Sequence, residues 1–370
     1  SEHKGVTRPP GYPLFLSFVY SIFGHSYQAV RIFQALIDTL TCLVIFYLGG
    51  AIFNFSIGHI AALGYAFYFP VIIYTGVLYT ETVFSLLLAI AMLFLLVAIK
   101  YDRFIHWMFS GLFLGATTLI SSRSEFVPFF ILIALLLNKY SLKNSFIKIG
   151  VIVLFMLLVI SPWTIRNYLV TGKFILIENY NQDGRGLWLA TNPYGAMTWS
   201  DPEVKELVKD MPINERVIFF QREARENLKR YPLSYLQTSI KRFFTLLFSS
   251  HGGHILGLQS SFHSAWTEKD WPVLCFKSLL LCINSLFTVF GFLGLWFSGI
   301  KREKEKLVLL VPIFYFIILH TFYVSSARLQ ISIIPYMMIF SILGIDRTLK
   351  LIFPRKSGHS EKFPVCRRSL

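Results

Sequence analysis

Nine long apolar stretches constrain the fold of this chain more than any other feature of its sequence. The run from Glu81 to Lys100, ETVFSLLLAIAMLFLLVAIK, shows their character, with a carboxylate at one end, an ammonium group at the other and no charge between. A helix needs about 20 apolar residues to cross the hydrocarbon of a bilayer. We therefore predict spans at 29–53, 59–77, 81–99, 107–121, 125–138, 148–169, 272–298, 307–324 and 329–349.

The composition supports a membrane protein and excludes other classes. The 370 residues are 55% hydrophobic and only 15% charged, whereas soluble domains carry roughly 25% charge. The net charge of +15 does not indicate nucleic acid, because the basic residues form short clusters between apolar runs. Three of the four cysteines lie inside apolar runs and Cys366 lies in the tail, so we expect neither a disulfide framework nor a zinc site.

Short basic segments indicate which ends of the spans face the cytoplasm. Lysines and arginines gather at 100–106, 139–148, 301–306 and from Arg347 onward, and such loops usually remain cytoplasmic. With these four segments inside, the nine spans alternate without conflict. The opposite face then receives residues 1–28, the turns at Glu81 and Arg123, the segment 171–270 and Arg328.

This topology predicts four regions in an all-α integral membrane protein of about nine spans. They are an N-terminal transmembrane region at 1–170 with an interfacial helix at 13–24, an extracytoplasmic loop region at 171–270, a C-terminal transmembrane region at 271–350 and a basic cytoplasmic tail at 351–370. Because the chain opens on a polar, proline-rich loop, we also expect that a preceding N-terminal span is missing from it.

Two helices are expected in the outer loop region. Ile213, Val217, Phe220, Ala224 and Leu228 repeat at the spacing of one helical face. Charged pairs four residues apart, Arg222 with Glu226 and Glu226 with Arg230, support a solvated opposite face. Pro232 stops this helix, and an amphipathic segment after it is predicted to lie in the membrane interface.

The charges at the outer face form the candidate site. Glu81, Arg123, Arg166, Arg328 and Arg8 all fall on this side. Ionisable groups at or in spans usually face a protein interior or an aqueous cavity, and arginine suits phosphate because its guanidinium makes forked contacts. For Arg8 and Arg166 we favour snorkelling to lipid head groups over a site role, and for Arg328 we favour the site role. Glu81 is compatible with pairing to an arginine or with a direct role.

Other polar residues in the spans and loops suggest less. Asp38, inside a predicted span, is expected to cap or bridge helices. His251, His254 and His263 could hold a metal, but three histidines in a glycine-rich loop seldom do. A divalent cation is compatible with the site, yet no residue pattern supports one. There is no Walker loop, no Rossmann glycine fingerprint and no HExxH.

The order of several segments resembles a known enzyme family. The segments are TRPPGYPLFLSFVYSIFG, AVRIFQALIDTLTCLVIFYLGGAIF, GVLYTETVFSLLLAI, LGATTLISSRSEFVPF, SPWTIRNYLVTGKFILIENYN, LWLATNPYG and ARLQISIIPYMMIF. In this order they resemble the GT-C superfamily of membrane glycosyltransferases, in the bacterial branch similar to protein O-mannosyltransferases and the lipid A aminoarabinose transferase. The resemblance covers nearly the whole chain, although no single motif is highly specific.

The resemblance implies an activity and a set of partners. Such enzymes take a sugar from a polyprenyl-phosphate donor and place it on an envelope protein, lipid or glycan at the extracytoplasmic face of a bacterial inner (plasma) membrane, with inversion. Arg123 and Arg328, followed by Arg166 and Arg8, would bind the donor phosphate. Glu81 matches the family's acid at the outer end of its helix, where it would orient a hydroxyl or hold an arginine.

The sequence departs from the family pattern at one point, and this leaves other functions open. The family has an Asp or Glu early in its first external loop, and the only acid before Arg8 in this sequence is Glu2. A non-catalytic or degenerate membrane partner is therefore an alternative. A secondary transporter is a weaker one, because transporters bind near the bilayer midplane between repeated halves and this chain shows no internal repeat.

Overall fold

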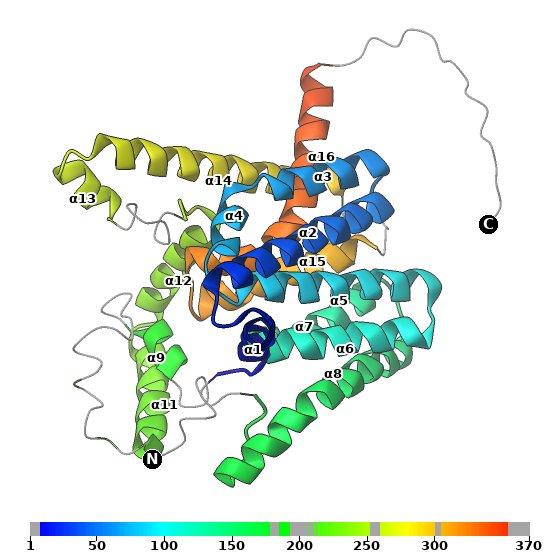
Figure 1. The fold of residues 1–370 in the computed structure, drawn as a ribbon, viewed down its shortest axis with the longest axis vertical. Helices are drawn as coiled ribbons and strands as arrows, with labels where there is room; N and C mark the ends of the chain where they lie inside the picture. Colours follow the sequence, from blue (N-terminus) through cyan, green and yellow to red (C-terminus); the bar gives the residue numbers. More distant parts are fainter. Residues whose placement is uncertain are drawn as a thin grey trace.

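The protein is helical throughout the part of the chain that the structure describes. The computed structural model describes residues 8–177, 185–192, 206, 211, 213–251, 260–299 and 305–353. Its α-helices and 3₁₀ turns (η) are shown in Figure 1. In chain order they are α1 (Gly11–Phe23), α2 (Tyr27–Ile52), α3 (Phe55–Ala66), α4 (Phe69–Thr75), α5 (Glu81–Tyr101), α6 (Phe104–Ile120), η1 (Ser122–Ser124), α7 (Val127–Leu137), α8 (Leu142–Thr171), α9 (Arg185–Thr191), α11 (Ile213–Arg230), α12 (Pro232–Leu247), α13 (Phe262–Thr267), α14 (Trp271–Ser298), α15 (Lys306–Phe322), η3 (Ala327–Ser332) and α16 (Ile334–Ile352).

Each predicted span corresponds to helical structure, but the helices differ in length. Within the described residues, α2, α5, α8 and α14 are long and apolar enough to cross a membrane, and the bent pair α3–α4 makes a fifth if it acts as one span. The apolar helices α6 and α15 have 17 residues each and α7 has 11. Length and composition by themselves thus support four or five of the nine predicted crossings.

Two predicted spans are not single continuous helices. The segment 59–77 consists of α3 and α4, whose axes differ by 55°. Pro70 stands in the first turn of α4, and proline inside a helix would remove a hydrogen bond and clash with the preceding turn. The segment 329–349 likewise begins as η3, and α16 starts only at Ile334 with Pro335 in its first turn.

Helix α5 forms the centre of the bundle, with α2, α6, α15 and η3 packed around it. In its most apolar 18-residue window 67% of residues are buried, against 28–33% in the other three long helices. A central position fits this sequence, because a helix that is apolar on all sides can be buried on all sides. The first residue of α5 is therefore carried into the interior of the protein.

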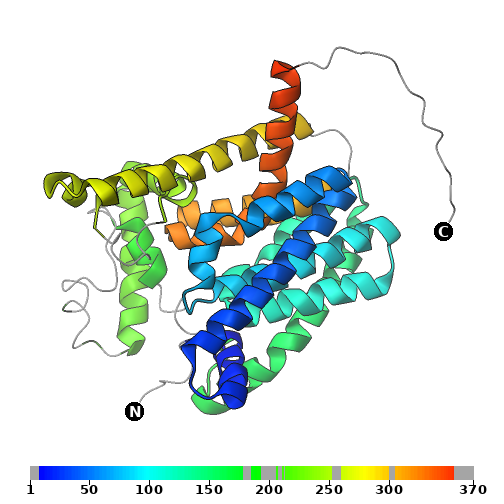
Figure 2. The same cartoon turned by 45° about the horizontal axis from the view of Figure 1, so that its top comes forward.

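Glycines permit the closest helix crossings. Helices α14 and α16 pack against each other, as Figure 1 and Figure 2 show from two directions. A Cβ atom on Gly294 would collide with the carbonyl oxygen of Phe340, and one on Gly344 with that of Phe290. Small residues allow such approach in membranes, where helix association depends on tight packing and not on apolar burial from water.

The loop region contains the two expected helices and a small core of its own. Trp188 and Leu189 of α9 pack against Phe220 and Ala224 of α11, so these two residues of the predicted apolar face are buried here. The Arg230–Glu226 pair forms at 3.1 Å, whereas Arg222 pairs with the adjacent Glu223 instead of Glu226. Helix α12 follows α11 directly and packs on α15; its predicted place in the membrane interface stays a prediction.

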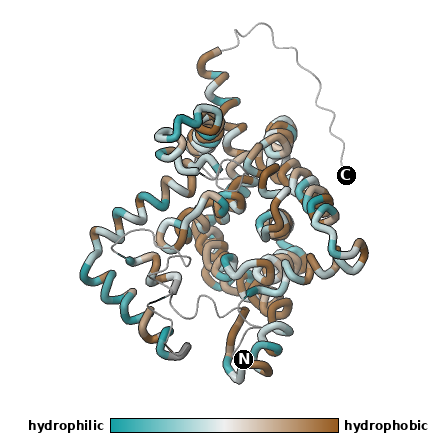
Figure 3. Tube along the Cα trace, turned by 60° about the vertical axis from the view of Figure 1, so that its left-hand side comes forward, coloured by the Kyte–Doolittle hydropathy of each residue, from teal (hydrophilic) through white to brown (hydrophobic). Residues whose placement is uncertain are grey.

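The outer surface of the bundle is apolar, as expected of a multi-pass membrane protein. Along α2, Ile32, Leu36, Leu40 and Leu43 are 49–62% exposed and share one face. Figure 3 shows that much of the bundle is hydrophobic, whereas polar stretches are more frequent in peripheral segments. This exposed apolar face of α2 is suited to contact lipid chains and not water.

Candidate functional site

Glu81 is held in the interior at the first residue of α5. Its side chain is 0% exposed, and a carboxylate in the first helical turn is favoured by the helix dipole. The loop before it is fixed from α2, because Gln34 Nε2 donates to the carbonyl oxygens of Thr75 and Val77 at 2.8 and 2.9 Å. Tyr12 of α1 in turn donates to Gln34 Oε1 at 2.8 Å.

Two arginines from distant parts of the chain share one oxygen of Glu81. Arg328 Nε lies 3.1 Å from Glu81 Oε1, and Arg123 Nη2 lies 3.5 Å from the same atom. The other oxygen, Oε2, accepts a hydrogen bond from Thr80 Oγ1 at 3.3 Å. The structure therefore brings together three of the five predicted site residues, and we call Glu81, Arg123 and Arg328 the charge cluster.

Arg123 is oriented by groups on three sides. Its Nε donates to Ser121 Oγ at 2.9 Å, and its guanidinium lies 5.0 Å from the centre of the Phe84 ring. The hydroxyl of Tyr315 on α15 donates to the Arg123 carbonyl oxygen at 2.6 Å. The short turn η1 is thus tied to α5, α6 and α15, and the Arg123 side chain remains 17% exposed.

Arg328 is the more accessible cation of the cluster. It lies on η3, its guanidinium is 4.9 Å from the centre of the Tyr79 ring, and its side chain is 39% exposed. The turn is anchored by Gln330, whose Oε1 lies 2.8 Å from His251 Nε2 and whose Nε2 donates to the Leu247 carbonyl oxygen at 3.3 Å. A buried polar contact after α12 thus holds η3 in place.

The chemistry of the charge cluster favours an anion. One carboxylate faces two guanidiniums, so the cluster carries a net charge of +1, and the carboxylate is the fully buried member. Both arginine side chains keep some exposed surface, 17% for Arg123 and 39% for Arg328. Guanidinium groups in this arrangement can make charge-assisted hydrogen bonds to phosphate oxygens.

Tyr12 contributes a neutral hydroxyl beside the cluster. Burial, with a smaller contribution from the charge of Glu81, raises the pKa of the Tyr12 hydroxyl above its usual value. The group therefore remains protonated at neutral pH. It acts as a hydrogen-bond donor to Gln34 and not as a base.

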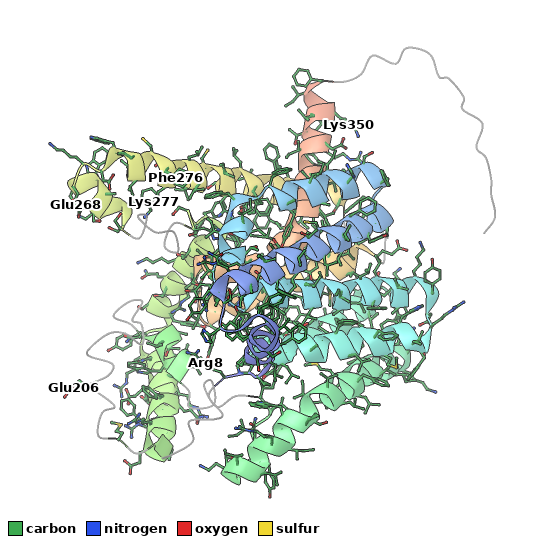
Figure 4. The ribbon with its side chains drawn as sticks, in the orientation of Figure 1. Arg8, Glu206, Glu268, Phe276, Lys277 and Lys350 are labelled. Atoms are coloured by element: carbon green, nitrogen blue, oxygen red, sulfur yellow. The ribbon has the colours of Figure 1, made fainter. Side chains whose placement is uncertain are left out.

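The other candidates from the sequence lie outside the cluster. The contacts described for Arg166 are to Asn167 Oδ1 at 3.3 Å and to the ring of Trp163, both on α8. Arg8 precedes α1 and is exposed, as Figure 4 shows. Asp38 bridges helices as predicted, because it accepts hydrogen bonds from Tyr65 at 2.8 Å and Thr75 at 3.2 Å.

The histidines do not assemble in the described part of the chain. No group of three or more His, Cys, Asp or Glu residues suited to hold a metal occurs among the described residues. His251 is buried against Gln330, His263 lies on α13, and His254 lies outside the described residues. The Glu2 position and the tail beyond residue 353 also lie outside them.

The sequence did not predict which residues position the cluster, and it named His251 only as a possible metal ligand. Tyr79, Ser121, Tyr315, His251 and Gln330 position the arginines through the contacts above. Gln330 carried the clearest signal, since it is a polar residue in an apolar stretch two positions after Arg328. Tyr315 gave no signal, because a tyrosine in an apolar helix is common.

Comparison with known proteins gives two similarities. Residues 7–165 match the family model described as dolichyl-phosphate-mannose-protein mannosyltransferase. This segment includes Arg8, Glu81 and Arg123, whereas Arg166 and Arg328 follow it. No curated protein matches the chain significantly.

The second similarity is to a solved structure. The fold is similar to archaeal oligosaccharyltransferase AglB from Archaeoglobus fulgidus, solved in complex with an inhibitory peptide and a dolichol-phosphate, with a TM-score of 0.51 and 12% identity. The match covers 95% of this chain and 44% of the archaeal chain, so this chain spans less than half of that protein's length. At this identity the likeness concerns the fold.

Proposed function

We propose that this chain is a membrane glycosyltransferase of the GT-C superfamily, as its sequence predicts, and that it transfers a sugar from a polyprenyl-phosphate donor. The family match of residues 7–165 and the shared fold support this proposal. The acceptor is an envelope protein, lipid or glycan at the extracytoplasmic face of a bacterial inner membrane. The observation that carries the proposal is the charge cluster, in which Arg123 and Arg328 converge on the buried Glu81.

In this reaction the arginines would stabilise the leaving group, which is the polyprenyl phosphate. An acceptor hydroxyl oxygen forms a bond to the anomeric carbon from the face opposite the phosphate, its proton passes to a general base, and the bond from that carbon to the phosphate oxygen breaks. The electron pair stays on the phosphate, whose charge changes from about −1 to −2. Guanidiniums placed beforehand beside this oxygen stabilise the charge as it develops.

The geometry favours a positioning role for Glu81 over contact with a sugar hydroxyl. Its side chain has no exposed surface, and its Oε1 atom is engaged by both arginines. A buried carboxylate that contacts both guanidiniums is suited to fix their positions relative to each other and to keep them within the protein. We therefore assign the orientation of Arg123 and Arg328 to Glu81.

Donor binding tests the proposal directly. The purified protein is titrated with a polyprenyl phosphate, and Arg123→Lys and Arg328→Lys are compared with Arg222→Lys, an exposed arginine on α11. Loss of a forked contact of about 1.4 kcal/mol weakens binding about tenfold, so each cluster variant should bind about tenfold more weakly and the control should not change. Unchanged affinity in both cluster variants contradicts the phosphate assignment.

Transfer is measured separately, with radiolabelled polyprenyl-phosphate sugars in membranes that contain the protein. Label should appear on an envelope acceptor, and Arg328→Ala should reduce it more than Arg222→Ala does. Donor binding without any transfer would favour the non-catalytic partner over the enzyme.

A further inference from the structure

A second site with charged residues lies between α2, the end of α3 and α4. It is a pocket of about 340 Å³, and since a water molecule takes up about 30 Å³ of liquid, it has room for a small polar group many times that size. None of its lining residues belongs to the charge cluster. The lining includes Arg31, Asp38 and Cys42 of α2, Ala66 of α3, and Ile72 and Thr75 of α4.

The pocket holds one cation and one anion that do not pair with each other. Arg31 Nε donates to the Gly76 carbonyl oxygen at 2.9 Å, and Asp38 Oδ2 accepts from Thr75 Oγ1 at 3.2 Å. Thr75 is the last residue of α4 and Gly76 follows it, so the two charged groups are brought to the same end of this helix. No ion pair joins Arg31 to Asp38 among the ion pairs of the described residues.

The surroundings of this pocket are suited to lipid. Ile32, Leu36 and Leu40 of α2 and Ile72 of α4 are 49–62% exposed beside it. Charged groups at a lipid-facing surface are costly unless a partner compensates them. A partner for both groups must offer an anion to Arg31 and a hydrogen-bond-donating cation to Asp38.

We propose that this pocket binds the head group of an aminophospholipid of the ethanolamine type. The phosphate contacts the guanidinium of Arg31, the primary ammonium donates to the carboxylate of Asp38, and the acyl chains lie along the apolar face of α2. An anionic glycerol head group has no cation for Asp38. A choline head group has no N–H to donate.

The experiment uses the full chain in detergent and measures lipid binding by native mass spectrometry. Phosphatidylethanolamine, phosphatidylcholine and phosphatidylglycerol with the same acyl chains are added singly and in pairs. Wild-type protein should prefer phosphatidylethanolamine about tenfold, the value of one charge-assisted contact of about 1.4 kcal/mol. Asp38→Asn should abolish the preference, whereas Arg31→Gln should weaken the binding of all three lipids, because each carries the phosphate that Arg31 contacts.

Controls make the result decisive. Asp346→Asn removes a carboxylate of α16 that pairs with Lys350, and it should leave the preference unchanged. Arg31 is exposed, so its replacement tests the proposal even if Asp38→Asn does not fold. Equal binding of the three lipids to the wild-type protein, or unchanged binding of phosphatidylethanolamine in Arg31→Gln, overturns the proposal.

A soluble competitor identifies the source of the head group. Free phosphoethanolamine should displace the lipid only at concentrations far above those of the lipid itself, because it lacks the acyl chains. Displacement at equal concentration would overturn the assignment to a membrane lipid and identify the pocket as a site for a soluble amine phosphate.

Discussion

The charge cluster makes a quantitative prediction about the replacement of Glu81 by glutamine. The substitution keeps the size of the side chain but removes the charge that Arg123 and Arg328 share. Glu81 is 0% exposed, whereas the two arginine side chains are 17% and 39% exposed. The two guanidiniums would then face each other across a neutral amide.

The expected cost follows from these distances and exposures. Unit charges 3.1 and 3.5 Å apart attract by about 5 kcal/mol each at an effective dielectric constant of about 20, before desolvation is subtracted. Breaking a buried pair typically costs about 3–5 kcal/mol, and water at the exposed arginines recovers a part. We expect Glu81→Gln to lower the free energy of unfolding by about 3 kcal/mol, and Arg328→Gln by about 1–2 kcal/mol because Glu81 keeps Arg123.

The double variant separates this reasoning from a general loss of packing. Glu81→Gln with Arg328→Gln removes one of the two repelling cations, so it should be no less stable than Glu81→Gln. The free energy of unfolding is measured in mixed micelles by SDS titration, followed by circular dichroism. Additive losses in the double variant, with no coupling above about 0.5 kcal/mol, would refute the shared-charge account.

Three further predictions concern other parts of the molecule. Gly294→Ala should cost about 1–3 kcal/mol of stability, because the added Cβ collides with α16 at the α14–α16 crossing. The thermal unfolding temperature in detergent should therefore fall. Gly150→Ala is the control and should leave this temperature unchanged, because a Cβ on Gly150 has nothing within 4 Å. Lys148 lowers the pKa of the Asp102 carboxyl by its hydrogen bond. The stability that this bond provides is therefore present above the unfolded pKa of about 4 and is lost as the pH falls through the folded pKa. Unfolding measured from pH 6 downward should depend less on pH in Asp102→Asn, and an identical dependence would contradict the assignment. His251→Ala removes the contact that anchors η3, so affinity for a polyprenyl phosphate should fall about fivefold, for about 1 kcal/mol; an unchanged dissociation constant would show that η3 holds its position without it.

Much of the fold could be predicted because its signals are local. Apolar length predicted the positions of the helices, and their bounds agree within a few residues for α2, α5 and α14. The breaks before α4 and α16 were missed, although Pro70 and Pro335 stand at them, because apolar composition was weighted above proline. The face of each helix that packs inward could not be read, since the spans are apolar on nearly all sides.

The site was predicted in part. The alternation of spans placed Glu81, Arg123 and Arg328 at one face, and the structure joins them. No ion pair of the described residues joins Arg166 to Glu81, and the contacts described for Arg166 include Asn167 and Trp163 of its own helix. Sequence position could not separate these cases, because all three arginines stand near the ends of apolar runs and only the packing of α8, η1 and η3 decides which side chains meet Glu81.

The sequence by itself determined that this chain is a helical membrane protein with charged residues at the ends of its apolar runs, because hydrophobic length and charge at span ends act locally. Only the tertiary structure decided that Glu81 is buried and shared by two arginines, and that Arg31 and Asp38 face one pocket. The first relation depends on how α5, η1 and η3 pack, over separations of 42 to 247 residues between Glu81 and the two arginines, and the second on how α2 packs with α3 and α4. Such contacts arise from close packing of whole helices, which no local pattern of residues encodes.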